Sequence, residues 1–246
     1  MNTKLKYTMF FTGEKHGPNI IPRPWVENLI KTEIPEGTID LPVKDGKWFD
    51  HMTMGGHIVN YDSLLVLTHF KGHTMGGFCG SNKNIGIGCA DGRIGKGMIH
   101  TVKGSDNLWS IAEEELMERI TESSKAIVDH FGKNITFINC LRNMSVSCDC
   151  EGVGAEPVVT PNIGIVASTD ILAVDQASVD LVFALKDDDR KALCERMTTR
   201  HGLRQLSYMK KIGMGNDRYH LIDIDNEDAE ISPADAVKDV VPFTAE

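Results

Sequence analysis

The sequence lacks clustered basic residues, long apolar segments and cysteine pairs in Cys-x-x-Cys spacing. Its net charge is −9, and phosphate binding requires clustered Lys and Arg, so we expect no nucleic-acid partner. No apolar run approaches the length that crosses a bilayer, and the apolar stretch near the N-terminus is too short for a signal sequence. We therefore expect a cytoplasmic protein with no membrane partner.

The six cysteines are limited in their chemistry by their spacing. Without a Cys-x-x-Cys pair, the thioredoxin motif, the usual zinc ribbon and the cysteine run of a ferredoxin cluster are excluded. A disulfide framework is disfavoured in a chain that is not secreted. The thiols should therefore serve metal or redox chemistry, or core packing, as we expect for Cys140 and Cys194.

Periodic patterns along the chain indicate the secondary structure. Apolar runs predict strands, and a 3.6-residue period with end signals at Asp170 and Gly132 predicts helices. A hairpin with an Asp45-Gly46 turn is expected within 41–49. Strands are expected at 4–11, around 64–67, and at 135–141, 163–168 and 219–225, and helices at 25–32, 106–131, 171–185 and 188–212.

This order of elements predicts the fold class. Strands alternate with helices after residue 100, and 41% of the 246 residues are apolar, enough for a substantial core. We expect a single α/β domain over residues 1–225, with a mixed, largely parallel sheet flanked by helices. The strand around 64–67 is apolar on both faces, as a central strand should be. An acidic, loosely ordered tail should follow over 226–246.

Two long loops, near 71–97 and 142–162, each follow a predicted strand. Ligands of open α/β sheets bind outside the carboxyl ends of the strands, and long loops in compact domains are often functional. We therefore expect the functional residues in these two loops.

The first loop opens with His69, Lys71 and His73. If the strand continues through them, all three side chains share one face, because strand side chains alternate. Imidazole binds metals or moves protons near neutral pH, and lysine suits an anionic substrate. The alternative is that both histidines only hydrogen-bond to loop backbone.

The glycines that follow expose backbone N–H groups that could hold an anion. Residues 90–96 approach a phosphate-binding P-loop, but Gly97 replaces the hydroxyl residue and the next segment does not look helical. We therefore expect no nucleotide, and glycine turns around a rigid core remain an alternative. The candidate residues for binding a small anionic substrate are His16, Arg23, Lys83, Asn84 and Lys96.

The second loop contains Cys148-Asp149-Cys150-Glu151. A Cys-x-Cys pair in extended backbone can place both sulfurs on one side, and thiolates select zinc, iron–sulfur clusters or copper(I). The alternative is a pair of reduced surface thiols. Residues of the first loop and its neighbourhood could complete a metal site: His69, His73, Cys79, Cys89 and His100.

The acidic residues of two predicted helices can be explained without a catalytic or metal-binding role. The group Glu113, Glu114, Glu115 and Glu118 is expected to form a solvated helix face that suits the macrodipole. Asp175, about one turn after Asp170, should face either the crevice or solvent.

Five motifs occur in order along the chain: LTHFKGHTMGGF, SNKNIGIGCADGRIGK, NMSVSCDCEG, GIVASTDILAVDQASVDLV and HGLRQLSYMKKIGMGNDRYHLIDID. Together they resemble the uncharacterised iron–sulfur-centre proteins grouped as domain of unknown function 362. Many members carry a ferredoxin-like insert, but residues 98–108 of this sequence form only a short connection. The resemblance thus implies a shortened member without the insert. A stretch near 33–42 is also shorter than in relatives, and Cys79 stands where they tend to have glycine.

Three functional hypotheses follow. The first is a redox-related enzyme with an iron, zinc or iron–sulfur centre, held by ligands among His69, His73, Cys89, Cys148 and Cys150. Lys71, Lys83 and Arg23 would then hold an anionic substrate, and His100 would act as an acid or base. The second is a non-redox enzyme with His69 or His73 as general base. The third is an accessory protein that delivers metal or docks to a redox partner.

Overall fold

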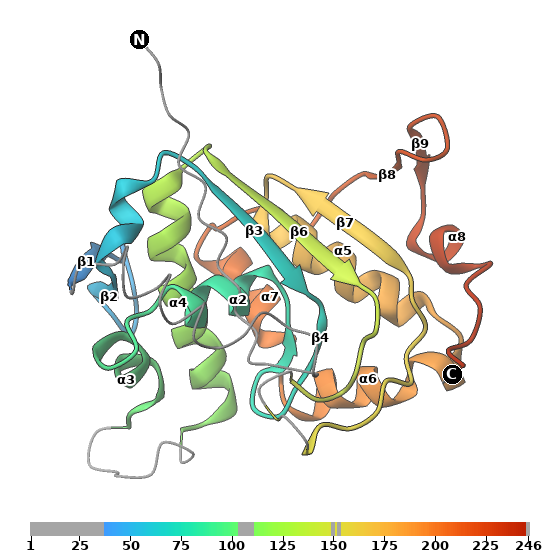
Figure 1. The fold of residues 1–246 in the computed structure, drawn as a ribbon, viewed down its shortest axis with the longest axis horizontal. Coiled ribbons are helices and arrows are strands. Elements are labelled where there is room, and N and C mark those ends of the chain that lie inside the picture. The colour runs from blue at the N-terminus through green and yellow to red at the C-terminus, as the bar shows by residue number, and fades with distance from the viewer. Residues whose placement is uncertain (1–36, 103–110, 149–150, 152–153, 245–246) are drawn as a thin grey trace, which may run out of the picture.

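A three-stranded sheet in the order β3-β6-β7 forms the centre of the fold (Figure 1). It is seen in a computed structural model that describes residues 37–102, 111–148, 151 and 154–244. Strand β3 (Leu64–His69) runs parallel to β6 (Ile135–Leu141), whereas β7 (Gly164–Ser168) runs antiparallel to β6. The sheet is mixed, as predicted, but only one of its two described pairs is parallel. The strand expected at 4–11 and the helix expected at 25–32 lie outside the described residues.

The two faces of this sheet differ in burial. Val66 and Phe137 point into the core, where α2 (Ser81–Gly88) and α5 (Ile171–Ala184) pack on the sheet. On the opposite face, the side chains of Leu65 and Ile165 are 63% and 64% exposed. The expectation that β3 is a central strand buried on both faces is therefore wrong for the described part of the sheet. Apolarity alone did not distinguish a covered face from an open one.

The predicted helices between and after the strands are present. Helix α4 (Glu113–Phe131) ends at Gly132, whose φ of 55° suits a glycine stop. Helix α5 begins at Asp170, whose carboxylate accepts hydrogen bonds from the first-turn N–H groups. The stretch 188–212 divides into α6 (Asp187–Thr199) and α7 (Arg204–Lys211). None of the described helices is both long and apolar enough to cross a membrane.

The stretch 71–97, predicted as a long loop, is mostly regular structure. It contains the hairpin of β4 (Lys71–His73) and β5 (Gly77–Cys79), then α2 and α3 (Ile94–His100). The buried carboxylate of Asp175 accepts hydrogen bonds from the N–H groups of Ser81 (2.7 Å) and Asn82 (2.9 Å) at the start of α2. This tertiary anchor stabilises a helix of low intrinsic propensity, which local sequence patterns do not reveal.

Short elements complete the two ends of the described chain. A hairpin is present, but its strands β1 (Thr38–Pro42) and β2 (His51–Gly55) lie mostly outside the predicted 41–49, which is largely the loop between them. A 3-10 turn follows at Gly56–Asn60. At the other end, β8 (Leu221–Asp223) pairs with β9 (Ala229–Ile231), and α8 (Pro233–Val237) packs on α5. The tail beyond residue 226 therefore contains ordered elements, contrary to the expectation of loose order.

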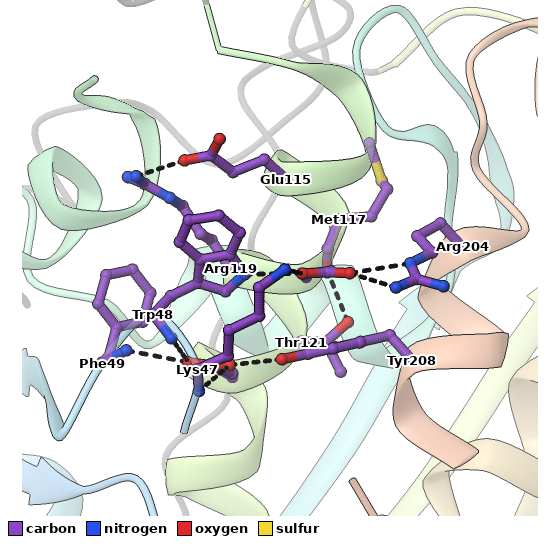
Figure 2. Close-up of polar contacts among 11 residues, drawn as sticks. Lys47, Trp48, Phe49, Glu115, Met117, Arg119, Thr121, Arg204 and Tyr208 are labelled. Atoms are coloured by element: carbon purple, nitrogen blue, oxygen red, sulfur yellow. Dashed lines mark hydrogen bonds and ion pairs between the residues drawn. The ribbon is translucent and has the colours of Figure 1, made fainter. Parts of the chain in front are cut away.

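Two buried carboxylates of α4 hold the β1–β2 loop and α7 against this helix (Figure 2). Glu122 accepts hydrogen bonds from three consecutive backbone N–H groups of residues 47–49 and from the Tyr208 hydroxyl (2.6 Å). Glu118 binds the side chains of Lys47, Trp48 and Arg204. The expectation that Glu118 lies on a solvated face is wrong, because partners distant in sequence surround it.

Glu118 should make the stability of the fold depend on pH in acid solution. Burial favours its neutral form, but hydrogen bonds from Lys47, Arg204 and Trp48 outweigh this and lower its pKa from 4.5 to about 2. The ionised carboxylate thus contributes about 3 kcal/mol above pH 5, and this contribution is lost as the pH falls toward 2. Urea unfolding should show wild type about 3 kcal/mol more stable than Glu118→Gln at neutral pH, with the difference nearly gone at pH 2. A difference independent of pH would contradict this assignment.

Candidate metal centre

The β4–β5 hairpin begins where β3 ends, at a break in the strand. The N–H group of Phe70 still donates to the carbonyl of Cys140 in β6. Lys71, however, begins β4, which belongs to a separate two-stranded sheet. In the hairpin, Lys71 lies opposite Cys79, and His73 lies opposite Gly77. The condition for His69, Lys71 and His73 to share one face, a strand that continues through all three, is therefore not met.

The loop after β6 packs directly against this hairpin. The N–H group of Gly72 donates to the carbonyl of Ser145 (2.7 Å), and a Cβ at Gly72 would lie 2.2 Å from the carbonyl oxygen of Val146. Arg196 of α6 donates to the same Val146 carbonyl (2.9 Å). Glycine at position 72 thus allows the close approach that brings Cys148 to the hairpin.

His73, Cys79 and Cys148 form a cluster, in which each residue offers one ligand atom and these atoms all lie within 4.8 Å of one another. Both cysteines are 6% exposed, so water has little access to their sulfurs. We call these three residues the Cys–His cluster. Two thiols and an imidazole match the ligands that zinc and iron prefer in proteins.

Burial controls the protonation of the cluster. It lowers the pKa of His73, and the interaction with Cys148 only partly opposes this effect. The hydrogen bond with Cys148 and burial together raise the pKa of Cys79 well above its usual range. Lys71 and Lys83 act in the opposite direction on Cys79, because positive charge favours the thiolate. Burial thus favours the neutral form of His73 and, together with the Cys148 hydrogen bond, the protonated thiol of Cys79, whereas the two lysines partly oppose this at Cys79.

His73 is held in one tautomer by the turn that follows it. Its Nδ1 atom accepts hydrogen bonds from the N–H groups of Met75 (3.1 Å) and Gly76 (2.8 Å). A neutral imidazole with Nδ1 as acceptor carries its proton on Nε2. Since Nδ1 is engaged, Nε2 is the nitrogen that remains for the contact with Cys148.

Glu151 ties Cys148 to the hairpin turn. One oxygen of its carboxylate accepts hydrogen bonds from the N–H group of Cys148 (2.8 Å) and from the Thr74 hydroxyl (2.6 Å). Burial opposes ionisation of Glu151, but these hydrogen bonds outweigh it and hold the pKa below its usual value. An ionised Glu151 thus fixes the loop that carries Cys148.

Residues 26–180 match the family described as a domain of unknown function (DUF362), which is more than half of the chain. The chain belongs to this family. The matched residues include the whole Cys–His cluster. No curated protein and no solved structure matches the chain. The family match specifies no cofactor, so iron–sulfur ligation and the shortening of this member stay predictions.

This DUF362 member places two further candidates beside the cluster. Lys71 is buried, and its Nζ lies 3.5 Å from Nδ1 of His69, whose Nε2 contacts the carbonyl of Arg142 at 2.8 Å. Lys83, in the first turn of α2, acts electrostatically on both His73 and Cys79. Asn84 instead donates to Leu67 and Thr68 of β3.

Other candidates lie apart from the cluster or outside the described residues. Cys89, at the end of α2, is not part of the group, and burial raises its pKa to about 12. Lys96 and His100 belong to α3, which packs mainly against β2 and α4. The segment after Lys96 is helical, contrary to expectation. His16, Arg23 and Cys150 lie outside the described residues.

A buried polar network holds the β4–β5 hairpin that carries the cluster. No sequence pattern indicated this network. Gln205 of α7 donates to the carbonyls of Gly76 (3.0 Å) and Phe78 (3.1 Å) and accepts from Asn82. Asp175 anchors Ser81 and Asn82, and burial raises its pKa to about 6 although its hydrogen bonds oppose this. Asp175 therefore faces the core, neither the crevice nor solvent.

Proposed function

We propose that this protein binds a single transition-metal ion through Cys79, Cys148 and His73. The proposal is supported by the three ligand atoms that lie within 4.8 Å of one another. In a tetrahedral zinc site, with Zn–S of about 2.3 Å, the sulfurs lie about 3.8 Å apart, so a small adjustment would close the site. Three protein ligands leave one position open, as in catalytic rather than structural zinc sites.

The open position suits a small anionic ligand. Two thiolates neutralise a divalent ion, and the positive charges of Lys71 and Lys83 act on the same site. Lys71 is buried, and a buried cation interacts more strongly with an anion than an exposed cation does. We infer that the substrate is a small carboxylate, phosphate or related anion that contacts the metal.

A single ion fits the described ligands better than a cluster of several irons. Iron–sulfur clusters are held by several thiolates around a group of irons, and only two thiols meet in the described residues. Iron bound as a single ion would give the redox function that the sequence suggested, whereas zinc has no redox chemistry. The identity of the metal therefore decides between a redox and a hydrolytic or transfer reaction.

The alternative role of His73 as general base is disfavoured by its hydrogen bonds. A base must present an unprotonated nitrogen to its substrate, but Nδ1 faces two amide donors and Nε2 carries the proton. His73 is better placed to donate to a Cys148 thiolate or, after loss of this proton, to bind a metal.

Metal analysis tests the proposal directly. Protein purified without oxygen or chelators should contain close to one equivalent of zinc or iron. Reconstitution with cobalt(II) should give thiolate-to-metal charge-transfer absorption and the visible bands of a tetrahedral site. Absence of both bound metal and cobalt absorption in folded, reduced protein would overturn the proposal.

Metal binding at Nε2 should also change the turn after His73. The metal replaces the Nε2 proton, so a neutral ring must carry its proton on Nδ1, where it opposes the N–H groups of Met75 and Gly76. We expect zinc to shift the amide resonances of both residues in ¹H–¹⁵N spectra. The matched control is Cys148→Ser, in which the same shifts should require a free zinc concentration about 100-fold higher or more. Bound zinc with unchanged resonances would show that His73 is not a ligand.

A further inference from the structure

We propose that Cys79 and Cys148 are also a modification site, at which a hydroperoxide converts the two thiols into a reversible disulfide. The two sulfurs come from different segments, the β5 strand and the loop after β6, yet they lie within 4.8 Å of each other. A disulfide bond requires a separation of about 2.05 Å, so the sulfurs need to approach by at most about 2.7 Å.

The two thiols of this pair lie in different kinds of structure, one in a paired strand and the other in a loop. Cys79 lies in β5, whose neighbours Gly76 and Phe78 are fixed by Gln205 of α7. Cys148 lies in the loop after β6, which is tied by Glu151 and by the Gly72–Ser145 contact. Loops move more readily than paired strands, so we expect the loop to supply the movement that closes the bond.

The reaction balances with hydrogen peroxide as the oxidant. One thiolate attacks a peroxide oxygen, the O–O bond breaks, and a sulfenic acid and water result after proton transfer. The second thiol then attacks the sulfenic sulfur, the S–O bond breaks, and a disulfide and a second water form. Two thiols lose two electrons and two protons, and the peroxide accepts them.

The surroundings favour this pair over the other described thiols. Cys79 and Cys148 are two thiols that belong to one group of neighbouring ligand atoms. Cys89, at the end of α2, is not part of this group. Cys140 and Cys194 belong to no group of neighbouring ligand atoms among the described residues.

Disulfide formation and metal binding should exclude each other, because the disulfide removes two of the three ligands. The mutual exclusion depends on the proposed metal site, whereas the formation of the disulfide does not. Bound metal should protect both thiols from peroxide, and oxidation should release the metal. The pair would then make the loaded state of the site dependent on the redox conditions.

The experiment compares reduced, metal-free protein with zinc-loaded protein. Stoichiometric hydrogen peroxide should remove two hydrogens from the intact mass of the metal-free protein, and peptide mapping should join Cys79 to Cys148. Dithiothreitol should reverse the change, and prior zinc loading should slow it at least tenfold. Formation of the bond at equal rates with and without zinc would overturn the exclusion and leave the disulfide itself established.

Variants identify the partner of Cys148. Cys150→Ser should retain the bond, whereas Cys79→Ser and Cys79→Ala, checked for folding by circular dichroism, should lose it. A bond that survives in the Cys79 variants and disappears in Cys150→Ser would overturn the proposal. Mapping in the wild-type protein, which needs no variant, would overturn it equally if Cys79 stayed reduced.

Discussion

Replacing Cys148 with serine should weaken zinc binding by about 100-fold or more. Zinc bound by four ligands in small peptides gains about 10–16 kcal/mol, so one thiolate among a few ligands accounts for roughly 3 kcal/mol. Serine has nearly the same shape, but its hydroxyl is not ionised at neutral pH and is a poor zinc ligand. The affinity should be measured by competition with a chromophoric chelator at fixed pH under reducing conditions.

Cys140→Ser is the matched control for this prediction. Cys140 is also a partly buried thiol, but it lies in β6 and is not part of the Cys–His cluster. Its replacement should change zinc affinity less than about twofold, and Cys79→Ser should match Cys148→Ser. If Cys148→Ser binds zinc like wild type while Cys150→Ser does not, the metal lies elsewhere in the loop.

The sequence predicted that functional residues of the two loop regions would lie together, but it did not predict which residues would contact one another. His73 and Cys148 were both candidates, and the structure brings them together. The strand does not continue as the period-two argument required, because it breaks at the buried Phe70 and places His69 and His73 in different sheets. The cluster contains Cys79 rather than Cys89 because the β4–β5 hairpin, with a φ of 72° at Gly77, reverses the chain and brings Cys79 back beside β4.

The parts that sequence reasoning missed share one physical cause. Helix α2 has two glycines in eight residues, and a buried Asp175 from α5 satisfies its first N–H groups. Glu118 and Glu122 look like surface residues of α4, but their partners lie 70 to 86 residues away. Local sequence patterns indicate helix propensity and amphipathicity. They do not indicate hydrogen-bond partners that only the tertiary fold brings close.

Replacing Glu122 with alanine should destabilise the fold by about 4 kcal/mol, the largest loss we expect from a single charged side chain. Three backbone N–H groups of residues 47–49 and the Tyr208 hydroxyl would lose their acceptor, and each unsatisfied group costs about 1–3 kcal/mol. The total stability of a domain is about 5–15 kcal/mol, so the variant should melt far below wild type. Urea unfolding monitored by tryptophan fluorescence would follow this directly, since Trp48 lies in the loop.

Glu122→Gln separates hydrogen bonding from side-chain volume. Its amide oxygen still accepts from Trp48 and Phe49, and Tyr208 can reverse its hydroxyl to accept, but the amide nitrogen opposes the N–H group of Lys47. The loss should therefore lie between that of alanine and zero, at about 1–3 kcal/mol. Glu114→Ala is the surface control, because its carboxylate is exposed and pairs with the exposed His201, and it should cost under about 0.5 kcal/mol. If Glu122→Ala were as mild as Glu114→Ala, water would satisfy the loop equally well, and the carboxylate would not be what holds the β1–β2 loop to α4.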